Sequence, residues 1–530
     1  MTPQSRTALA APALAACLAL ASAAHAAQPC EALNKLDLAN TSITRAESVA
    51  AGAYKPPVGK VPPNMPAFCQ VAGAIKPTSD SNIYFEVWMP ESNWNGKFQG
   101  AGNGGFAGAI GYDQLMNAVA HGYATAGTDT GHHAGGTDAS WALDHPEKIA
   151  DFGYRAIHET AVKAKAIIHA FYGEDPKRSY FSSCSNGGRQ ALMEAQRYPE
   201  DYDGIIAGAP ANYWTHLLAN AAWDNLALLG DKDSYIPPKK LPAIQAAALA
   251  ACDALDGVKD GVIENPPRCH FDPDALLCKD AESDSCLTAP QVAALKKLYA
   301  GGHNSHGQIF PGYSSGGEAE FGGWATWITG PSPEHSLMYA FSTQFYKNMV
   351  FDNANWDYHT FDADRDTKAA EDKQTRNLNA TDPDLSRFRA RGGKLILYHG
   401  WSDAAIAPQN TVDYYGSVAA KMGDRQTAGF VRLFMVPGMQ HCGGGSGANS
   451  FGQFSVSSGD PEHDVDAALE RWVEKGVAPE RIVAAKRKSD LDPSSAIVRT
   501  RPLCAYPLVA RYKGSGSTDD AANFVCGKHE

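Results

Sequence analysis

The sequence predicts an α/β fold, in which a mainly parallel sheet is flanked by helices and interrupted by a large lid. Strand-like runs alternate with helical patterns from about residue 84 to 207. The alternation stops near residue 212 and resumes at Gly393. Such alternation is typical of a parallel sheet with crossover helices. We therefore expect one core in two parts, 27–211 and 391–530, separated by a lid domain at 212–390.

The first 26 residues have the pattern of a signal peptide. A charged start at Arg6 precedes a short Ala/Leu run that ends in Ala24-His25-Ala26, a small-x-small cleavage site. Residues 14–17 also fit a lipoprotein box, which would acylate Cys17. Against a lipoprotein, the sequence stays apolar after Cys17 as far as Ala24, whereas a lipoprotein normally turns polar there. We expect export to the periplasm or medium, with a lipid anchor at Cys17 as the alternative.

The turn at Ser185 is the most informative feature of the first core segment. An apolar run from Tyr180 to Cys184 leads into it, and a helical pattern follows it. This is the context of a nucleophile elbow in an α/β-hydrolase, where a strained turn lifts the serine Oγ above the sheet. Small residues at Ser183 and Gly187 permit the close packing that the turn needs. A serine in a Gly-rich segment is by itself more often only a turn residue.

A Gly-rich loop at 100–105 follows a predicted strand end at Lys97-Phe98. It matches no phosphate-binding fingerprint. It suits a loop that offers a backbone N–H to an oxyanion, so Gly105 and Asn186 are the expected oxyanion hole. The His158-Glu159 pair lacks the second histidine of a zincin and is not expected to hold catalytic zinc.

The lid contains a candidate calcium loop at 252–265, where aspartates alternate with glycines. Calcium takes six to eight oxygen ligands, which can be carboxylates or backbone carbonyls. The expected ligands are the side chains of Asp253, Asp256 and Asp260 and the carbonyls of Val258 and Val262. The spacing is not that of an EF-hand, and a solvated acidic turn is the alternative. The ion would be structural.

The second core segment supplies the other two members of a catalytic triad. Asp403 follows an apolar strand run at 393–398, and His441 follows another at 430–436. The order serine, aspartate, histidine is that of α/β-hydrolases, and parallel strands bring their ends to one edge of the sheet. Asp403 would orient His441, which would take the proton of Ser185 as it attacks an acyl carbon.

The cysteines predict a disulfide framework. Eleven are present, and without Cys17 an even ten remain, as expected in a compartment where disulfides persist. No paired C-x-x-C spacing favours zinc. The sequence does not fix the pairing, but local spacing suggests Cys30–Cys69, Cys252–Cys269, Cys278–Cys286 and Cys504–Cys526, leaving Cys184 for Cys442. That last bridge would hold the nucleophile turn and the histidine loop together, since bonded cysteines keep their Cα atoms within about 4.4–6.8 Å.

Composition excludes several classes of function. The net charge of −12 comes without basic runs, which argues against nucleic acid. No later stretch is apolar enough to form a membrane span. We expect a monomer that acts on a small substrate.

With these residues assembled, the chain resembles the tannase and feruloyl esterase family of exported serine esterases. The motifs that carry the resemblance are Trp94-Asn95-Gly96, Cys184-Ser185-x-Gly-Gly, Tyr202-Asp203-Gly204-Ile205, Cys252 to Gly257, Leu397 to Gly400, Ser402-Asp403, Pro437 to Cys442 and Arg511 to Gly514. The resemblance implies an α/β-hydrolase core with a lid, a lid calcium and a disulfide beside the triad. It also implies hydrolysis of esters of aromatic acids such as ferulate and gallate. It places the triad, oxyanion and calcium roles on the residues already named.

Within the family, the chain is similar to enzymes that hydrolyse mono(2-hydroxyethyl) terephthalate (MHET). The resemblance implies substrate contacts at Trp327, Phe341, Ser342 and Ile406. Those enzymes hold the free carboxylate of the substrate with a lid arginine, whose best match here is Leu337. We therefore expect neutral feruloyl or galloyl esters to be preferred. MHET-hydrolase activity is one alternative, a serine peptidase is another, and a hydrolase-fold binding protein with a decayed triad is a third.

Overall fold

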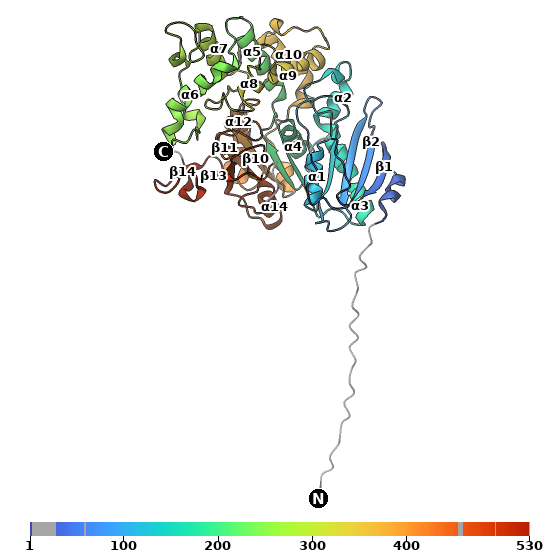
Figure 1. Cartoon of the computed structure of the whole chain (residues 1–530). Coiled ribbons are helices and arrows are strands. Elements are labelled where there is room, and N and C mark those ends of the chain that lie inside the picture. The colour runs from blue at the N-terminus through green and yellow to red at the C-terminus, as the bar shows by residue number, and fades with distance from the viewer. Residues whose placement is uncertain (3–27, 58–59, 454–458, 493, 529–530) are drawn as a thin grey trace.

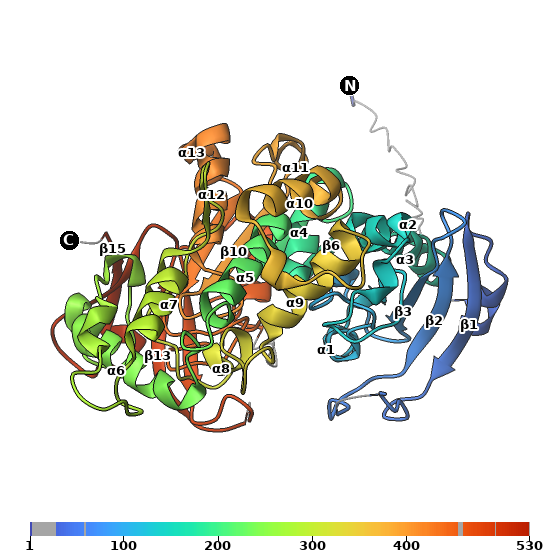
Figure 2. The same ribbon diagram turned by 90° about the horizontal axis from the view of Figure 1, so that it is seen from above.

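The computed structural model describes residues 1–2, 28–57, 60–453, 459–492 and 494–528 (Figures 1 and 2). Apart from its first two residues, the expected signal peptide at 1–26 lies outside this range, and so does Cys17; both remain predictions. Within the described ranges, no helix combines the length and the apolar character that a membrane span needs.

A nine-stranded sheet forms the centre of the molecule, in the order β1-β2-β3-β5-β4-β6-β7-β10-β11. The first three neighbouring pairs, from β1 to β5, are antiparallel, and all pairs from β5 to β11 are parallel. The expected α/β class with a mainly parallel sheet is confirmed. The strands are β1 (Thr41–Val49), β2 (Phe68–Ile75), β3 (Ile83–Pro90), β4 (Lys97–Ala101), β5 (Ala124–Thr128), β6 (Arg178–Cys184), β7 (Gly204–Gly208), β10 (Lys394–Gly400) and β11 (Val431–Val436).

Helices cover both faces of this sheet. Successive side chains of a strand point to opposite faces, and β10 shows the consequence. Leu395 and Leu397 pack in one cluster with α3 (Ala156–Tyr172), α4 (Asn186–Arg197) and α12 (Gln409–Met422). Ile396 and Tyr398 pack in another cluster with α14 (Val465–Lys475). Helix α1 (Tyr112–Ala120) packs in a further cluster with side chains of β2 and β3.

The chain between β7 and β10 forms the lid, whose helices gather on one side of the sheet in Figure 1. Its core merges with loops at the carboxyl edge of the strands, because Phe106 and the segment 404–407 belong to the same hydrophobic cluster as the lid helices. The lid therefore lies over the edge where parallel strands collect a site. Its elements are α5 (Trp214–Leu229), α6 (Leu241–Cys252), α7 (Ala289–Ala300), β8 (His303–Asn304), β9 (Gly307–Gln308), α8 (Trp324–Trp327), α9 (Leu337–Phe345), α10 (Ala363–Leu378) and α11 (Ser386–Ala390).

Two antiparallel hairpins complete the fold, β12 (Arg481–Arg487) with β13 (Ile497–Cys504) and β14 (Val509–Tyr512) with β15 (Phe524–Gly527). Figure 2 shows these hairpins at the opposite end of the molecule from β1 and β2. The structure pairs the cysteines as the spacing suggests: Cys30–Cys69, Cys184–Cys442, Cys252–Cys269, Cys278–Cys286 and Cys504–Cys526.

The helical pattern of residues 150–172 predicts one long helix, but the structure interrupts it. A short helix α2 (Pro146–Ala150) passes into a π-helical turn at Asp151–Arg155 before α3 begins. Gly153 lies in this turn, where an added Cβ would come within 2.3 Å of the Asn377 carbonyl oxygen. The remaining short elements are α13 (Asp424–Thr427), a second π turn at Tyr346–Val350, and 3-10 turns at Cys30–Lys35, Ser140–Ala142, Pro238–Lys240, Asp253–Asp256, Pro266–Arg268, Pro273–Leu276, Tyr358–Thr360 and Ala521–Asn523.

Candidate active site

Ser185 occupies a strained turn between β6 and α4. Its φ of 66° and ψ of −127° lie outside the conformations that side-chain-bearing residues favour. Close packing holds the turn, since a Cβ added at Gly187 would lie 1.9 Å from the Ser183 Oγ. The Ser185 N–H donates to the Gly208 carbonyl at 3.0 Å, which ties the turn to β7. The strain is therefore supported by the surrounding backbone, as a nucleophile elbow requires.

The structure brings Ser185, His441 and Asp403 into one hydrogen-bonded chain. The Ser185 Oγ lies 2.9 Å from His441 Nε2, and His441 Nδ1 lies 2.8 Å from Asp403 Oδ2. The disulfide between Cys184 and Cys442 joins residues 258 positions apart, with Cα atoms 6.1 Å apart. Each cysteine is the sequence neighbour of a triad residue, so the bridge fixes the distance between the serine turn and the histidine loop.

Asp403 is buried and all of its acceptor positions are in use. Its Oδ1 accepts from the N–H groups of Ala405 and Ile406 at 2.7 and 2.9 Å, and its Oδ2 accepts from His441. Burial alone would raise the pKa of Asp403, but the nearby His441 and His399 outweigh it and hold that pKa well below its usual range. Asp403 is therefore ionised, as the partner of a triad histidine must be.

His399 is a second histidine on the same carboxylate, and the sequence analysis assigned it no role. It is fully buried in β10, with its Nε2 3.1 Å from Asp403 Oδ2 and its Nδ1 2.7 Å from Thr411 Oγ1. If Nε2 carries the proton toward Asp403, Nδ1 accepts from the threonine hydroxyl. The available signal was a polar residue inside an otherwise apolar strand run, four positions before the acid.

Gly105 and Asn186 are the residues expected to form the oxyanion hole, and the structure shows the state of both backbone N–H groups. Gly105 has a φ of +55°, and an added Cβ would lie 2.3 Å from the Gly136 carbonyl oxygen. Across the residues described, no acceptor receives the Gly105 N–H. Asn186 is the first residue of α4, so its N–H has no acceptor within the helix and the helix dipole favours negative charge there.

Aromatic rings of the lid lie beside the histidine. The Trp327 ring meets the His441 ring edge to face at 4.9 Å, and Phe341 lies nearly parallel to Trp327 at 6.3 Å. Phe341 also contacts Phe106, the neighbour of Gly105, at 5.3 Å between ring centres. Trp327 and Phe341 are both partly exposed, so part of each ring remains accessible.

Comparison with known proteins identifies the family. The sequence profile described as tannase and feruloyl esterase matches residues 69–527. This chain belongs to the tannase and feruloyl esterase family. An uncharacterized esterase of Xanthomonas campestris pv. campestris is 46% identical over 97% of this chain and 93% of its own. The protein named "Probable feruloyl esterase B-2" of Aspergillus terreus is 35% identical, with 86% of each chain covered.

Solved structures agree with this assignment. The crystal structure of feruloyl esterase B from Aspergillus oryzae superposes with a TM-score of 0.85 at 32% identity, covering 94% of this chain and 99% of the other. Tannin acyl hydrolase from Aspergillus niger shares the fold, with a TM-score of 0.74 at 23% identity over 95% and 94% of the two chains. The chain is thus an esterase of the tannase and feruloyl esterase type, a carboxylic ester hydrolase.

The four substrate contacts implied by the family fall in different places in this esterase. Trp327 and Phe341 lie with the triad. Ser342 is fully buried, and its hydroxyl donates to the Met338 carbonyl and accepts from Asn225 Nδ2, so it is satisfied inside the lid. Ile406 is also buried and touches the triad through its backbone N–H on Asp403. The structure thus offers two aromatic contacts, without a free hydroxyl at Ser342.

In the candidate calcium loop of the esterase, backbone N–H groups of the loop donate to the loop's own aspartate side chains. Asp253 accepts from the N–H groups of Asp260 and Gly261, each at 3.1 Å, and Asp256 accepts from Val258 at 3.0 Å. Burial, with the charge of Asp260 adding to it, raises the pKa of Asp256. Carboxylates and backbone carbonyls are the donors that calcium prefers, so the residues fit the ion in kind.

The C-terminal hairpins supply cations to the same loop. Asp260 is in contact with Arg501 at 2.5 Å and with Arg499 at 3.4 Å. These two guanidinium groups neutralise part of the acidic charge and tie the loop to β13. The apolar side chains of Val258 and Val262 are buried. Only the backbone carbonyl oxygens of these two residues could bind an ion.

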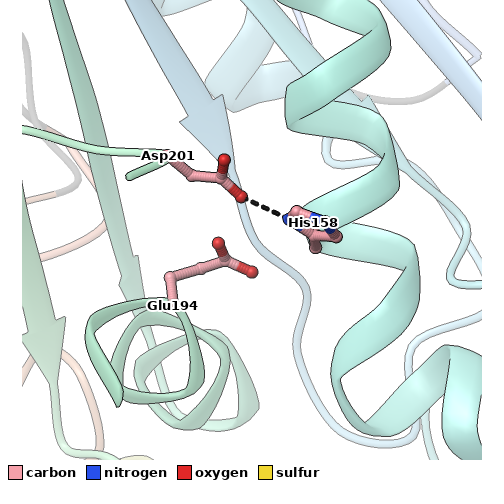
Figure 3. A group of neighbouring side chains, drawn as sticks. All are labelled: His158, Glu194 and Asp201. Carbon is pink, nitrogen blue, oxygen red and sulfur yellow. Dashed lines mark hydrogen bonds and ion pairs between the residues drawn. The ribbon is translucent and has the colours of Figure 1, made fainter. Parts of the chain in front are cut away.

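A separate group of titratable side chains lies between α3 and the far end of α4 (Figure 3). His158 Nδ1 lies 2.6 Å from Asp201 Oδ2, and Glu194 points into the space beside them. Glu194 is fully buried, and neither of its carboxylate oxygens has a hydrogen-bond partner among the described residues. The three ligand atoms lie within 4.8 Å of one another, so they could also hold a metal ion.

A bound proton accounts for this group with the residues present. The Lys165 ammonium donates to the Asp201 carbonyl and already places a cation beside the two acids. Burial and then the charge of Asp201 raise the pKa of Glu194 well above its ordinary value of 4.5. A neutral Glu194 can donate to a neighbouring carboxylate, which a charged one cannot.

Replacing Glu194 with Gln tests this assignment through stability. Unfolded Glu194 ionises near pH 4.5, whereas the folded protein keeps the proton to higher pH, so the wild type loses stability as pH rises above 4.5. Glu194→Gln removes that loss. We expect its Tm, relative to the wild type, to rise between pH 5 and pH 8 in a thermal-melt series. A relative Tm that falls over this range, together with a wild-type Tm that a zinc chelator lowers, would instead indicate a bound metal.

Proposed function

We propose that this chain is an exported serine carboxylesterase that hydrolyses esters of aromatic acids of the feruloyl or galloyl type. The observation that carries the proposal is the chain of hydrogen bonds from Ser185 through His441 to Asp403, beside the ring of Trp327. The names of the relatives support the aromatic acid. Five disulfides support an oxidising compartment.

The geometry fits a two-step mechanism through an acyl-enzyme. Ser185 Oγ attacks the ester carbonyl carbon as its proton passes to His441 Nε2, and ionised Asp403 stabilises the resulting imidazolium. The carbonyl oxygen becomes an oxyanion that accepts from the N–H groups of Gly105 and Asn186. The bond to the alcohol oxygen then breaks, His441 returns the proton to that oxygen, and the acyl group stays on Ser185.

Water completes the cycle by the same route. His441 takes a proton from a water molecule as its oxygen attacks the acyl carbon, which again passes through an oxyanion. The bond to Ser185 Oγ breaks and the serine regains the proton from His441, releasing the free acid. Because Asp403 stays ionised throughout, each proton transfer runs between His441 and an oxygen atom.

Substrate preference follows from the lid, which offers aromatic rings beside the triad. We expect kcat/KM on methyl ferulate or methyl gallate to exceed that on MHET. The family's MHET hydrolases bind the free carboxylate of MHET with a lid arginine, whose best match here is Leu337. A charge-assisted bond to a carboxylate contributes about 1.5–3 kcal/mol, so the absence of this bond should lower kcat/KM on MHET by about 10- to 150-fold. A panel of these three esters with p-nitrophenyl butyrate measures the preference. Faster hydrolysis of MHET would contradict this assignment and support the alternative.

Restoring the arginine at position 337 tests the same prediction by a gain of activity. Leu337 is the first residue of α9 and stands where the resemblance places the arginine. Leu337→Arg should raise kcat/KM on MHET, while the neutral Leu337→Gln should not. An unchanged MHET rate in Leu337→Arg would mean that this position does not face the substrate carboxylate.

We also propose a structural calcium ion held by the side chains of Asp253, Asp256 and Asp260 and the carbonyls of Val258 and Val262. When bound, the ion would neutralise the acids and stiffen the lid loop, and it would take no part in the chemistry. A ligand present at 100 times its Kd stabilises by about 2.7 kcal/mol. Chelation should therefore lower the Tm by about 2–3 °C for a chain of this length.

A thermal melt with and without EGTA measures this effect, with kcat read at a temperature well below unfolding. The variant Asp256→Asn should melt lower and lose its response to EGTA. The variant Asp280→Asn, on an exposed acid elsewhere in the lid, should keep the response. A wild-type Tm that EGTA leaves unchanged would favour an acidic turn neutralised by Arg499 and Arg501.

Two rival functions make different predictions. A serine peptidase on the same fold would cleave aryl amides, and a binding protein with a decayed triad would fail to react with a fluorophosphonate probe. The proposed esterase should react with the probe at Ser185 and leave amides intact. That this protein is a monomer stays an expectation.

A further inference from the structure

Arg189 is a fully buried cation one turn along α4 from Ser185. Its Nε donates to Asn186 Oδ1 at 2.8 Å. Its two terminal nitrogens donate to backbone carbonyls of Gly153 at 2.7 Å, Phe152 at 3.1 Å and Leu378 at 3.4 Å. In the part of the chain that the structure describes, no carboxylate pairs with it. Its charge is met only by carbonyl oxygens, the Asn186 amide and aromatic ring faces.

Keeping this charge inside the protein is costly unless something compensates for it. A buried ion without a counter-ion loses its hydration, and an apolar residue of similar volume would fill the same space without that cost. Two ring faces give partial compensation, with the guanidinium carbon 4.8 Å from the Phe152 centroid and 5.1 Å from that of Trp214. Burial lowers the pKa of Arg189 to about 9, with the charge of Arg197 adding to the effect. The group is therefore still charged at neutral pH.

The contacts of Arg189 reach both sides of the oxyanion hole. One side is direct, since the side chain holds the amide of Asn186, whose N–H is a proposed donor. The other side runs through the rings that the guanidinium stacks on, because Phe152 and Trp214 both pack against Phe106, at 6.3 and 5.7 Å between ring centres. Phe106 directly follows Gly105, the other proposed donor. The same group therefore braces the two segments that must present their N–H groups to one oxygen atom.

The lid meets Arg189 as well. Leu378 is the last residue of α10, and its carbonyl accepts from the same guanidinium nitrogen as Gly153 does. The π turn at Asp151–Arg155 supplies the other two carbonyls. Arg189 thus joins the nucleophile helix, the π turn and the end of the lid at one point.

We propose that Arg189 is a positioning residue for the oxyanion hole: it fixes the Asn186 and Gly105 segments and keeps a positive charge behind the atom that becomes negative in the acyl-transfer step. It touches no substrate and acts through Asn186, Phe106 and its own field. Preorganised dipoles and charges aimed at a developing oxyanion are worth more in a dry site than in water. This inference rests on the proposed function, since it assumes acyl transfer at Ser185.

The test compares Arg189→Met, which removes the charge and the hydrogen bonds, with Arg189→Lys, which keeps the charge alone. Loss of one oxyanion donor lowers kcat by about 10²- to 10³-fold. We expect Arg189→Met to lower kcat by about 10²-fold with KM changed less than about 3-fold, and Arg189→Lys to lie between it and the wild type. The matched control is Arg197→Met, on the same helix, where the guanidinium stacks on Tyr154 at 4.4 Å away from the triad. It should keep the wild-type kcat.

Two inhibitors separate positioning from a purely structural role. An aryl boronic acid forms a tetrahedral anion on the serine and resembles the oxyanion, whereas the amide of the substrate acid binds as a neutral planar molecule. Arg189→Met should weaken the boronate by about the factor lost in kcat and leave the amide within about 3-fold. Equal weakening of both inhibitors, or an unchanged kcat in a folded Arg189→Met, would overturn the proposal.

Should Arg189→Met fail to fold, Arg189→Lys decides with the same inhibitor pair. Selective weakening of the boronate supports the proposal, and equal or no weakening overturns it. Failure of the proposed function has a different signature: a wild-type protein that neither hydrolyses the ester panel nor reacts with fluorophosphonate at Ser185. The two results are therefore distinguishable in one set of measurements.

Discussion

Replacing Ser185 with Ala should reduce ester hydrolysis by at least about 10⁴-fold, since loss of a triad serine removes the acyl-enzyme route altogether. The fold should survive, because among the described residues the Ser185 hydroxyl is hydrogen-bonded only to His441 and alanine fits the same small turn. The measurement is kcat on methyl ferulate together with the Tm of the purified variant. Fluorophosphonate labelling should disappear with the activity.

Ser182→Ala is the matched control for this variant. Ser182 lies on β6, three residues before Ser185, and lines a cavity beside Asp466, away from His441. It should keep its activity and its labelling. Hydrolysis that persists in Ser185→Ala at more than about 1% of the wild-type rate would place the nucleophile elsewhere.

Removing the Cys184–Cys442 bridge should lower kcat as well as stability. In the variant Cys184→Ala with Cys442→Ala, the strained turn and the histidine loop are no longer tied. A misplacement of about 1 Å between reacting groups can cost about 10²-fold. We expect kcat to fall by about that factor. Unfolding should become easier by about 2–5 kcal/mol, as for other native disulfides.

The bridge Cys30–Cys69 provides the comparison, because it joins the N-terminal turn to β2, outside the triad and its loops. Cys30→Ala with Cys69→Ala should lower the Tm and leave kcat close to the wild type. Similar losses of kcat and Tm in both double variants would make Cys184–Cys442 an ordinary staple.

Much of this architecture was predictable because it depends on local patterns. The alternation of strand and helix predicted the mainly parallel sheet, which the structure confirms, and its interruption predicted the long segment between β7 and β10. Ser185, Asp403 and His441 were predicted to meet because each follows a strand end, where a parallel sheet gathers side chains, and the structure brings them into hydrogen-bond contact. The cysteine pairs were suggested by sequence spacing in four cases and by elimination in the fifth, and the structure bonds all five as suggested.

The residues that were missed carry no motif of their own in the sequence. His399 contacts Asp403 because the chain turns back after β10. In the sequence, His399 stands in an apolar strand run and looks like a core residue. The four partners of Arg189 come from α4, the π turn and the lid, so no local window contains them. The interruption of the 150–172 helix arises where Gly153 lets the lid backbone approach. Ser342 was assigned to substrate by resemblance, but its hydroxyl is satisfied inside the lid.

The most direct test of the account is a pre-steady-state burst followed by peptide mapping. The enzyme is mixed with a p-nitrophenyl ester of a methoxylated cinnamic acid and quenched in acid within the first turnover. It is then digested, and the peptide masses are measured by mass spectrometry. A nucleophilic Ser185 should release one equivalent of p-nitrophenol in the burst and carry the cinnamoyl mass on its peptide. An acyl group on another residue, or turnover without any acylated peptide, would contradict it.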